Sequence, residues 1–368
     1  MEKWFCVDRA ADLPTPALLI YPDRIEENIR RMIKMAGGPD RVRPHVKTHK
    51  MSEVVKLNMK HGITKFKCST IAEAEMVAQC GAKDILLAMQ PVGAHMQRFF
   101  ELQNHFQESR FSTLVDAEAI IEQIAVLASN KKQVTDLWLD INNGMDRTGI
   151  KPGKEALRLY QKIGCLPYIN LRGLHVYDGH IHDWKISDRR TACEKDYEPV
   201  ILLIGNIVKA GLKPPVIVAG GTPTLPIHAG RDNTETSPGT CVLWDGGYAG
   251  HFPDLDFIPA ALVLMCVVSK PNKNMLCLDL GHKALAAEMP HPRISLLNLS
   301  VRRFVNHSEE HLVIDTPEAD NYQPGDLIYG IPWHICPTVP RYKFAYVIRD
   351  GKVTEEWLID ARDRMLTI

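Results

Sequence analysis

The stretch KFKCSTIAEAEMVAQCGAKDILLAM, residues 65–89, contains one complete strand–helix–strand unit. Its two ends are short, mostly apolar runs, which favour strands. Between them, Thr70 and Glu73 have the spacing of a capping box that opens a helix, and Gly81 suits the end of that helix. Two strands joined by a helix form the basic unit of a parallel β/α sheet.

The same alternation of short apolar runs and helical segments extends from about residue 16 to residue 245. In the first helical segment, Pro22 suits the first helical position, isoleucines at every fourth position mark an apolar face, and Gly37 with Gly38 ends the helix. The predicted strands are residues 16–21, 42–47, 65–69, 84–89, 112–115, 136–141, 169–176, 216–220 and 241–244. Nine candidates are one more than a closed eight-stranded barrel needs.

The pattern changes after about residue 254, where strand-like runs such as ALVLMCVVS and KFAYVIRD are separated by Pro, Asn and Gly and show little helical period. A chain of 368 residues also exceeds the usual size of one hydrophobic core. We therefore predict two domains. Residues 22–248 form a β/α barrel, and residues 1–21 with 249–368 form a β-rich domain.

Lysine plus arginine and aspartate plus glutamate number 44 each, so the formal net charge is zero. This balance argues against nucleic acid and anionic membrane as partners. No apolar run approaches the about 20 residues that span a bilayer, and the N-terminus has no apolar stretch of signal-peptide length. The nine cysteines are odd in number and scattered. We expect a cytoplasmic protein.

The densest group of candidate functional residues is RPHVKTHK, residues 43–50, at the end of an early predicted strand. In β/α barrels the carboxyl ends of the strands form the active face, so a lysine there projects into the site. Lys47 is the candidate, because a neutral lysine amine can attack the aldehyde of a cofactor. The alternative is a solvated basic loop, since runs of charge usually face water.

Two further segments carry groups suited to ligands. In VIVAGGTPT, residues 216–224, glycine N–H groups and threonine hydroxyls could contact a phosphate, although Gly-Gly after a strand also suits an ordinary turn. In IPWHICPTV, residues 331–339, His334 and Cys336 are two apart, so an extended backbone puts both side chains on one face, as a metal requires. A loop histidine beside a buried cysteine is the alternative.

Taken together, LPTPALLI (residues 13–20), RPHVKTHK, CSTIAEAE (68–75) and DILLA (84–88) resemble the D-threonine aldolase and D-serine dehydratase family. This family is a branch of the alanine-racemase-like, fold-type III pyridoxal-phosphate enzymes. The resemblance implies an α/β fold, a (β/α)8 TIM-like barrel of alanine racemase type plus a C-terminal mostly-β domain. It also implies that Lys47 holds pyridoxal 5'-phosphate as a Schiff base.

The resemblance extends to individual site residues. It places Arg147 of NNGMDRTGI near the phenolic oxygen of the cofactor, and Tyr177 of HVYDGHIHD near its pyridine nitrogen. His180 or His182 is the candidate base toward a substrate hydroxyl. The expected phosphate contacts are Gly220, Gly221, Thr222, Thr224, Gly239 and Thr240. His334 and Cys336 are expected to hold a divalent metal, zinc being favoured and manganese the alternative.

The implied activity is a lyase reaction on a small D-amino acid that carries a β-hydroxyl. We expect dehydration, which gives a 2-oxo acid and ammonia, because Cys336 matches dehydratase-like members. Retro-aldol cleavage to glycine and an aldehyde is the main alternative. Racemisation and a non-catalytic cofactor-binding protein are the others, and the β-rich segment argues against a small cofactor carrier. By resemblance we also expect a homodimer with the active site completed at the subunit interface.

Overall fold

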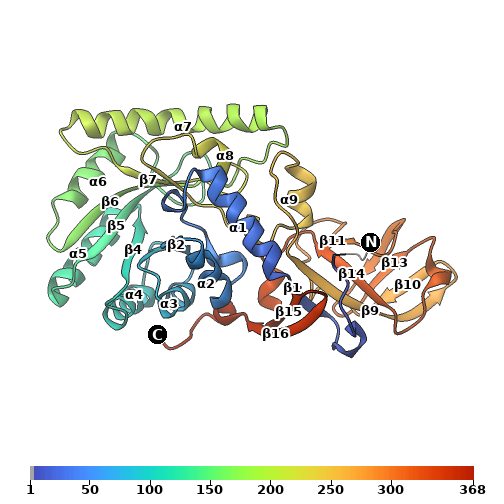
Figure 1. The fold of residues 1–368 in the computed structure, drawn as a ribbon. Helices are drawn as coiled ribbons and strands as arrows, with labels where there is room; N and C mark the ends of the chain where they lie inside the picture. The colour runs from blue at the N-terminus through green and yellow to red at the C-terminus, as the bar shows by residue number, and fades with distance from the viewer. Residues whose placement is uncertain (1–3) are drawn as a thin grey trace. The chain divides into compact units, whose positions relative to one another are not determined.

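A computed structural model describes residues 4–368, which divide into two compact units (Figure 1). The barrel unit comprises Arg30–Lys47, Val55–Gly239 and Asp363–Ile368. The β unit comprises the chain up to Ile29, with Thr48–Val54 and Thr240–Arg362. The domain boundaries inferred from sequence, at residues 22 and 248, stay a prediction.

The barrel unit is built on a seven-stranded parallel sheet whose strands follow chain order from β2 to β8. Its strands are β2 (Lys65–Cys68), β3 (Asp84–Leu87), β4 (Arg110–Val115), β5 (Thr135–Ile141), β6 (Ile169–Val176), β7 (Val216–Ala219) and β8 (Thr234–Thr236). Parallel order with one helix between neighbouring strands is the arrangement that the alternating pattern predicts. Leu86, Leu114, Trp138 and Val218 form a buried cluster of this unit.

Residues 42–45 close this sheet into a ring. Val42 bridges Thr236 of β8 and His45 bridges Lys67 of β2, both in parallel orientation. Arg43 N donates to Thr236 O at 2.8 Å, and Lys67 N donates to the carbonyl of Pro44 at 2.9 Å. Pro44 has no N–H of its own, so the segment pairs through bridges instead of a regular ladder. The fold expected from sequence, a TIM-like barrel of alanine racemase type, is thereby confirmed.

One strand prediction in this region is wrong, and one strand was missed. Residues 241–244 are not a strand, because the chain forms a 3-10 helix at Thr240–Val242. Their apolar character reflects burial, since none of these four side chains is more than 2% exposed. The strand that occupies the eighth position is β8, which the sequence analysis missed because Thr-Glu-Thr carries no apolar signal. Residues 16–21 do contain a strand, β1 (Ala17–Ile20), which belongs to the β unit.

The helices begin and end largely where the sequence signals lie. The Thr70 hydroxyl accepts from Glu73 N at 3.1 Å, as the predicted capping box requires, and the Glu73 carboxylate accepts from Ser69 N, one residue before the N-cap, at 2.6 Å. The helices are α1 (Pro22–Ala36), α2 (Ser52–Lys60), α3 (Ile71–Gln79), α4 (Ala94–His105), α5 (Glu118–Lys131), α6 (Lys154–Gly164), α7 (Ile186–Lys209), α8 (Leu225–His228) and α9 (Gly246–His251). Within residues 4–368, no helix is both long and apolar enough to cross a membrane.

The β unit contains a nine-stranded sheet in the order β12-β13-β10-β9-β1-β15-β16, with β14 paired to β9 and β11 paired to β14. Its strands are β1, β9 (Ala261–Asn272), β10 (Met275–Leu278), β11 (Ile294–Leu296), β12 (Arg303–His307), β13 (Leu312–Asp315), β14 (Leu327–Pro332), β15 (Phe344–Arg349) and β16 (Lys352–Leu358). β1 runs antiparallel to β9 and parallel to β15, so an N-terminal segment lies within the C-terminal sheet. The predicted mostly-β character of this part of the chain is confirmed.

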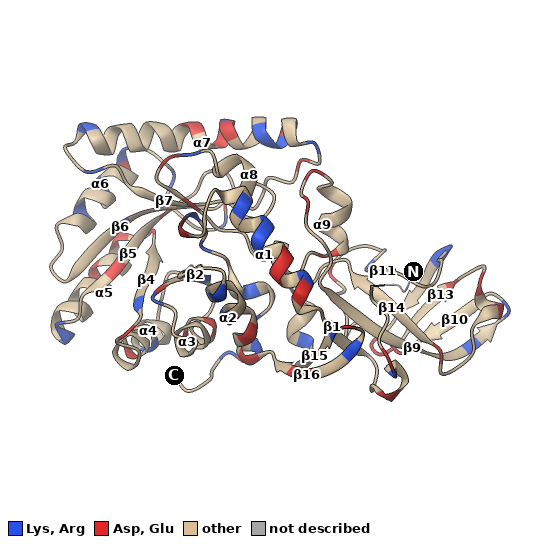
Figure 2. Cartoon of the chain, in the orientation of Figure 1, with Lys and Arg blue, Asp and Glu red and all other residues tan. Residues whose placement is uncertain are grey.

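Charged side chains of both signs occur along α1 and α7 (Figure 2). Arg43 is different, because its side chain is fully buried in the barrel unit. Its guanidinium contacts Glu235 at 2.7 Å and Asp84 at 2.7 Å. Burial alone would raise the pKa of the Asp84 carboxyl, but the Arg43 guanidinium outweighs it and brings that pKa down to about 2. Arg43 therefore ties β8 and β3 to the closing segment.

We predict that Arg43→Met destabilises the protein by about 3 kcal/mol, because two carboxylates lose their buried partner. Arg172 and Lys65 also contact these carboxylates, which keeps the loss at the lower end of the usual range. Urea unfolding followed by circular dichroism measures the change. The control is Arg158→Met, whose partners Glu118 and Glu155 are solvent-exposed, and which should lower stability far less than Arg43→Met. Equal effects of the two substitutions would contradict a structural role for Arg43.

Candidate active site

Three predicted cofactor residues converge at the carboxyl ends of the barrel strands. Lys47 lies in the turn Val46–Thr48 after the closing segment, and Tyr177 follows the end of β6. The Lys47 Nζ lies 5.8 Å from the centroid of the Tyr177 ring, and the guanidinium carbon of Arg147 lies 5.2 Å from it. Active sites of such barrels lie at this end of the sheet.

The loop that carries Arg147 is shaped by its own polar side chains. The side-chain oxygen Oδ1 of Asn142 accepts from Gly144 N and Asp146 N, each at 3.1 Å. Gly149 has a φ of 94°, and a Cβ there would lie 2.6 Å from Asn142 N, so the turn needs a glycine. The family-like segment therefore folds back after β5, with Arg147 exposed beside Tyr177.

The predicted phosphate contacts follow β7 and β8, which are neighbours in the sheet. Gly239 N donates to the Thr222 hydroxyl at 3.2 Å, which joins the two loops. A Cβ on Gly221 would lie 3.4 Å from the Tyr177 ring, so the glycine leaves space at this position. Gly220, with a φ of 71°, has no room for a side chain because His228 and Thr224 fill it.

Thr224 and Thr240, two of the predicted phosphate contacts, interact with protein groups in the structure. The Thr224 hydroxyl donates to Asp178 at 2.9 Å and accepts from Gly221 N at 3.2 Å, so it is engaged within the barrel unit. Thr240 belongs to the β unit, where its hydroxyl lies 3.4 Å from the Cys336 sulfur.

Asp178, Cys193 and His228 form a buried cluster whose ligand atoms lie within 4.8 Å of one another, close enough to hold a metal ion. The hydrogen bonds of these three residues indicate that they pair with one another and with neighbouring groups instead of binding a metal. Arg231 Nε donates to His228 Nδ1 at 3.2 Å, which leaves the proton on Nε2, and Nε2 lies 2.7 Å from Asp178. Burial raises the pKa of the Cys193 thiol to about 12. The cluster is therefore a satisfied hydrogen-bond network.

The two candidate bases differ in their surroundings. His180 Nε2 lies 2.8 Å from an Asp196 carboxylate oxygen on α7, while its Nδ1 is buried without a hydrogen-bond partner. His182 is exposed. Of the two, His180 is the histidine that is oriented by a carboxylate and retains an unused ring nitrogen, as a general base requires.

Lys67 is a site residue that the sequence analysis missed. It lies on β2 with its side chain only 2% exposed, and its Nζ lies 5.3 Å from the centroid of the Tyr177 ring. Burial, together with the charge of Lys47, lowers the pKa of Lys67 to about 7. The strand pattern could not reveal it, because a lysine in Lys-Phe-Lys-Cys is expected to face water.

The predicted metal ligands lie in the β unit, in the loop that follows β14. The Cys336 sulfur lies 3.2 Å from the Thr48 hydroxyl of the same unit. Burial opposes ionisation of Cys336, but the hydrogen bond from His334 outweighs it and lowers the pKa of the thiol. The same contact helps to raise the pKa of His334 to about 9, against the effect of its burial. His334 and Cys336 are thus brought together as an imidazole and a thiol that ionises readily.

Two carboxylates support this loop, and neither was predicted. Glu288 lies 2.5 Å from His334 Nδ1, which leaves Nε2 as the histidine nitrogen available to a ligand. Asp245, only 2% exposed, accepts from Ile335 N at 3.0 Å, between the two predicted ligands. Burial raises the pKa of Asp245 to about 6.

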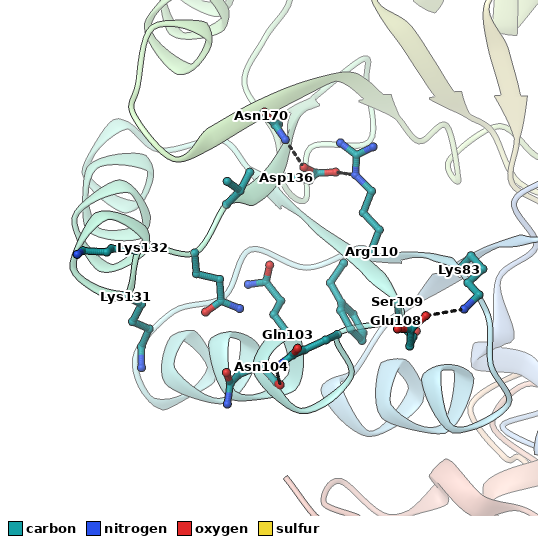
Figure 3. A pocket seen from close by; sticks show the side chains of 14 residues that line it. Lys83, Gln103, Asn104, Glu108, Ser109, Arg110, Lys131, Lys132, Asp136 and Asn170 are labelled. Carbon is teal, nitrogen blue, oxygen red and sulfur yellow. Dashed lines mark hydrogen bonds and ion pairs between the residues drawn. The ribbon is translucent and has the colours of Figure 1, made fainter.

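A polar pocket lies at the opposite, amino-terminal ends of the barrel strands (Figure 3). Asp136 at its centre pairs with Arg110 and accepts from Asn170 at 3.1 Å. These charges are already paired, and the chemistry of such barrels takes place at the other end of the sheet. The pocket is therefore not the candidate active site.

The residues present fit both implied groups. In the barrel unit, a lysine and an arginine face a tyrosine ring beside a glycine that leaves space, and His175 Nε2 is buried without a partner. This set suits an anionic aldehyde such as pyridoxal 5'-phosphate. In the β unit, imidazole nitrogen and thiolate sulfur are the donors that zinc prefers.

Comparison with known families agrees with this site. Residues 20–245 match the family described as "Alanine racemase, N-terminal domain", and residues 260–348 match the "Putative serine dehydratase domain". The first match covers more than half of the chain, so the protein belongs to the alanine racemase N-terminal domain family. The members that it resembles here are fold-type III pyridoxal-phosphate enzymes.

Individual relatives narrow the class. The chain is 26% identical to D-threonine aldolase of Arthrobacter sp., over 96% of this chain and 94% of the relative. It is 28% identical to D-threo-3-hydroxyaspartate dehydratase of Delftia sp. strain HT23, over 65% and 63%. The structure of D-threonine aldolase from Filomicrobium marinum superposes with a TM-score of 0.86 at 26% identity, over 97% and 98%. These relatives are lyases, which confirms a pyridoxal-phosphate-dependent lyase as the enzyme class.

We predict that Lys47 alone bonds covalently to pyridoxal 5'-phosphate. Borohydride reduction of the holoenzyme followed by peptide mass spectrometry should place the label on Lys47, and Lys47→Ala should lose it. Lys50→Ala is the control and should keep the label, because Lys50 Nζ donates to the Ala361 carbonyl in the β unit. A label found on Lys50 or Lys67 in the wild type would show that the lysine is misassigned.

Proposed function

We propose that this protein is a pyridoxal-phosphate- and divalent-metal-dependent lyase that removes water from a D-β-hydroxy-α-amino acid, giving a 2-oxo acid and ammonia. The observation that carries the proposal is the His334–Cys336 pair, in a chain whose barrel unit gathers Lys47, Arg147 and Tyr177. D-Serine is the simplest substrate of this class, and D-serine dehydratase of Dictyostelium discoideum is 24% identical over 93% of the chain.

The barrel residues have separable roles in this proposal. When bound, the cofactor supplies an electron sink for the bond that breaks at Cα. Lys47 would hold the cofactor, and its Nζ would take the proton from Cα of the substrate. Arg147 is the fixed positive charge for the phenolic oxygen. Backbone N–H groups of the loops after β7 and β8, with the Thr222 hydroxyl, would hold the phosphate.

His334 Nε2 and the Cys336 sulfur would hold the metal, which assists departure of the β-hydroxyl. Glu288 would fix the histidine tautomer through Nδ1. Structures of D-threo-3-hydroxyaspartate dehydratase at 22% identity include a histidine-to-alanine variant and a cysteine-to-alanine variant, two positions apart, and the cysteine variant is described as metal-free. This spacing supports the assignment of the pair here.

Retro-aldol cleavage is the second candidate, favoured by the similarity to D-threonine aldolase over nearly the whole chain. His180 is the residue that would serve it, because its free Nδ1 could take the proton of the substrate β-hydroxyl while Asp196 holds Nε2. The Cα–Cβ bond then breaks and releases an aldehyde.

We predict that D-serine yields pyruvate and ammonia, and that D-threonine or D-3-hydroxyaspartate yields the matching 2-oxo acid. Chromatography of products from each separate substrate distinguishes the two reactions. Glycine together with an aldehyde would establish the aldolase in place of the dehydratase. L-Serine serves as the stereochemical control and should not react.

We also predict that turnover needs a metal bound by His334 and Cys336. Cys336→Ala should lose the metal in elemental analysis and lose at least about 100-fold in turnover, since loss of a ligand removes the metal that assists the leaving group. Cofactor binding should persist. The matched control is Cys193→Ala, which should keep the metal, because the Asp178 network is held by hydrogen bonds. Metal loss in Cys193→Ala with retention in Cys336→Ala would move the metal site to Asp178, Cys193 and His228.

A further inference from the structure

The interior of the barrel unit carries positive charge that its carboxylates do not neutralise. Lys47, Lys67 and Arg147 all lie within 6 Å of the Tyr177 ring centroid, at 5.8, 5.3 and 5.2 Å. Lys67 is the deepest of the three, at 2% exposed, whereas Arg147 is exposed. An amine buried beside other cations is costly unless it releases its proton or acquires an anionic partner.

The carboxylates that act on Lys67 are already engaged with other groups. Asp140 lies 2.7 Å from His175 Nδ1. Asp178 accepts from the Thr224 hydroxyl at 2.9 Å and lies 2.7 Å from His228 Nε2. Asp140 and Asp178 each favour a charged Lys67 and so raise its pKa. Burial and the charge of Lys47 lower that pKa by more, which leaves the pKa of Lys67 at about 7.

A second observation shows that the interior is incomplete without a ligand. The residue His175 is only 5% exposed, so water does not reach its Nε2 freely. This nitrogen is buried and has no hydrogen-bond partner. Burial and the nearby charges of Lys67 and Arg147 lower the pKa of His175, so its ring stays neutral beside them. Such an orphaned polar atom next to surplus cations is the environment that a polar, negatively charged ligand would complete.

We propose that Lys67 is a positioning residue whose positive charge balances the negative charge of the cofactor. Its Nζ takes up one proton from solvent when an anionic pyridoxal phosphate binds in the barrel unit. One N–H bond forms on the lone pair of Nζ, the bond between that proton and its donor, a buffer acid or hydronium ion, breaks, and no bond of the cofactor changes. The proposal rests on the proposed cofactor. It makes cofactor binding and proton uptake a single linked event.

The pH dependence of this event is set by every charged or titratable group that faces Lys67. These groups are Arg43 and His45 of the closing segment, Lys47 of the turn after it, Asp140 of β5, Arg147 of the loop after β5, and His175, Tyr177 and Asp178 at the end of β6. Among them Lys67 is the lysine whose folded pKa lies near neutrality, so it dominates proton uptake between about pH 7 and 9.

The test uses pyridoxine 5'-phosphate, which has the charge of the cofactor but no aldehyde and so cannot bond to Lys47. Calorimetric titration of the metal-loaded apoenzyme in buffers of different ionisation enthalpy counts the protons taken up. At about pH 8 the free wild-type protein holds little of the Lys67 proton, so uptake should approach one. The wild-type affinity should fall by up to about tenfold per pH unit above about pH 7.

Lys67→Met should take up close to no protons and show a weaker, flatter pH dependence. Lys67→Arg, which is always charged, should restore affinity at high pH without proton uptake. Lys83→Met, an exposed lysine paired with Glu108, is the matched control and should behave as the wild type. Protons that the ligand itself gains or loses on binding contribute equally to the wild type and to each variant, so they cancel when the proteins are compared.

Stability of the apoenzyme gives a readout that needs no cofactor. The folded pKa of Lys67 lies below the unfolded value of 10.5, so the unfolded chain holds the extra proton between about pH 7 and 10. The wild type should therefore gain stability relative to Lys67→Met as the pH rises through this window. Lys67→Gln serves in the same comparison if the methionine variant does not fold.

The outcomes distinguish failure of the role proposed for Lys67 from failure of the proposed cofactor. Binding without proton uptake in the wild type, or equal uptake in wild type and Lys67→Met, overturns the role of Lys67 and leaves the proposed function intact. Failure of the wild type to bind either pyridoxine 5'-phosphate or pyridoxal 5'-phosphate overturns both. Uptake in the wild type and in Lys83→Met that is absent from Lys67→Met supports the proposal.

Discussion

Arg43 places a fully buried guanidinium inside the barrel unit, where Glu235 and Asp84 each hold it at 2.7 Å. Because a buried charge without partners is very costly, this contact fixes the closing segment between β8 and β2. The direction of that segment then decides where the chain emerges. Lys47 follows directly and reaches the carboxyl ends of the strands, which is the end where parallel barrels carry out chemistry. The position of the lysine is thus a consequence of how the ring closes.

The site differs from the rest of the barrel interior in its charge balance. At the amino-terminal ends of the strands, Asp136 pairs with Arg110 and Arg172, and Arg172 also pairs with Asp84, so each of these charges has an opposite partner. At the carboxyl ends, cations converge on Tyr177 while the neighbouring carboxylates bind histidines. An excess of positive charge with an unused histidine nitrogen is the state expected of a site whose anionic ligand supplies the missing partner. The β unit holds a second kind of site, a thiol and an imidazole oriented by carboxylates.

Several elements of this arrangement could be predicted from the sequence, each for a local reason. The capping box at Thr70 forms because its groups are three residues apart on one turn. Lys47 was placed at the active face because it ends a predicted strand, whereas Arg147 and Tyr177 were placed beside the cofactor by the family resemblance, and the structure brings Lys47 and Arg147 to the Tyr177 ring. The spacing of His334 and Cys336 predicted side chains on one face, and the two side chains do interact.

What the sequence by itself determined was the type of each element and the end of the sheet at which the functional side chains lie, since both follow from periodicity and from turn residues. Only the tertiary structure decided which residues are buried and which groups pair across the chain. Lys67 on a polar-looking strand is buried, while residues 241–244 are apolar without being a strand. Asp245 and Glu288 approach His334 and Cys336 from distant segments. Burial and long-range pairing depend on the closed ring and the packed sheet, whose contacts join residues far apart in sequence, and no local pattern records them.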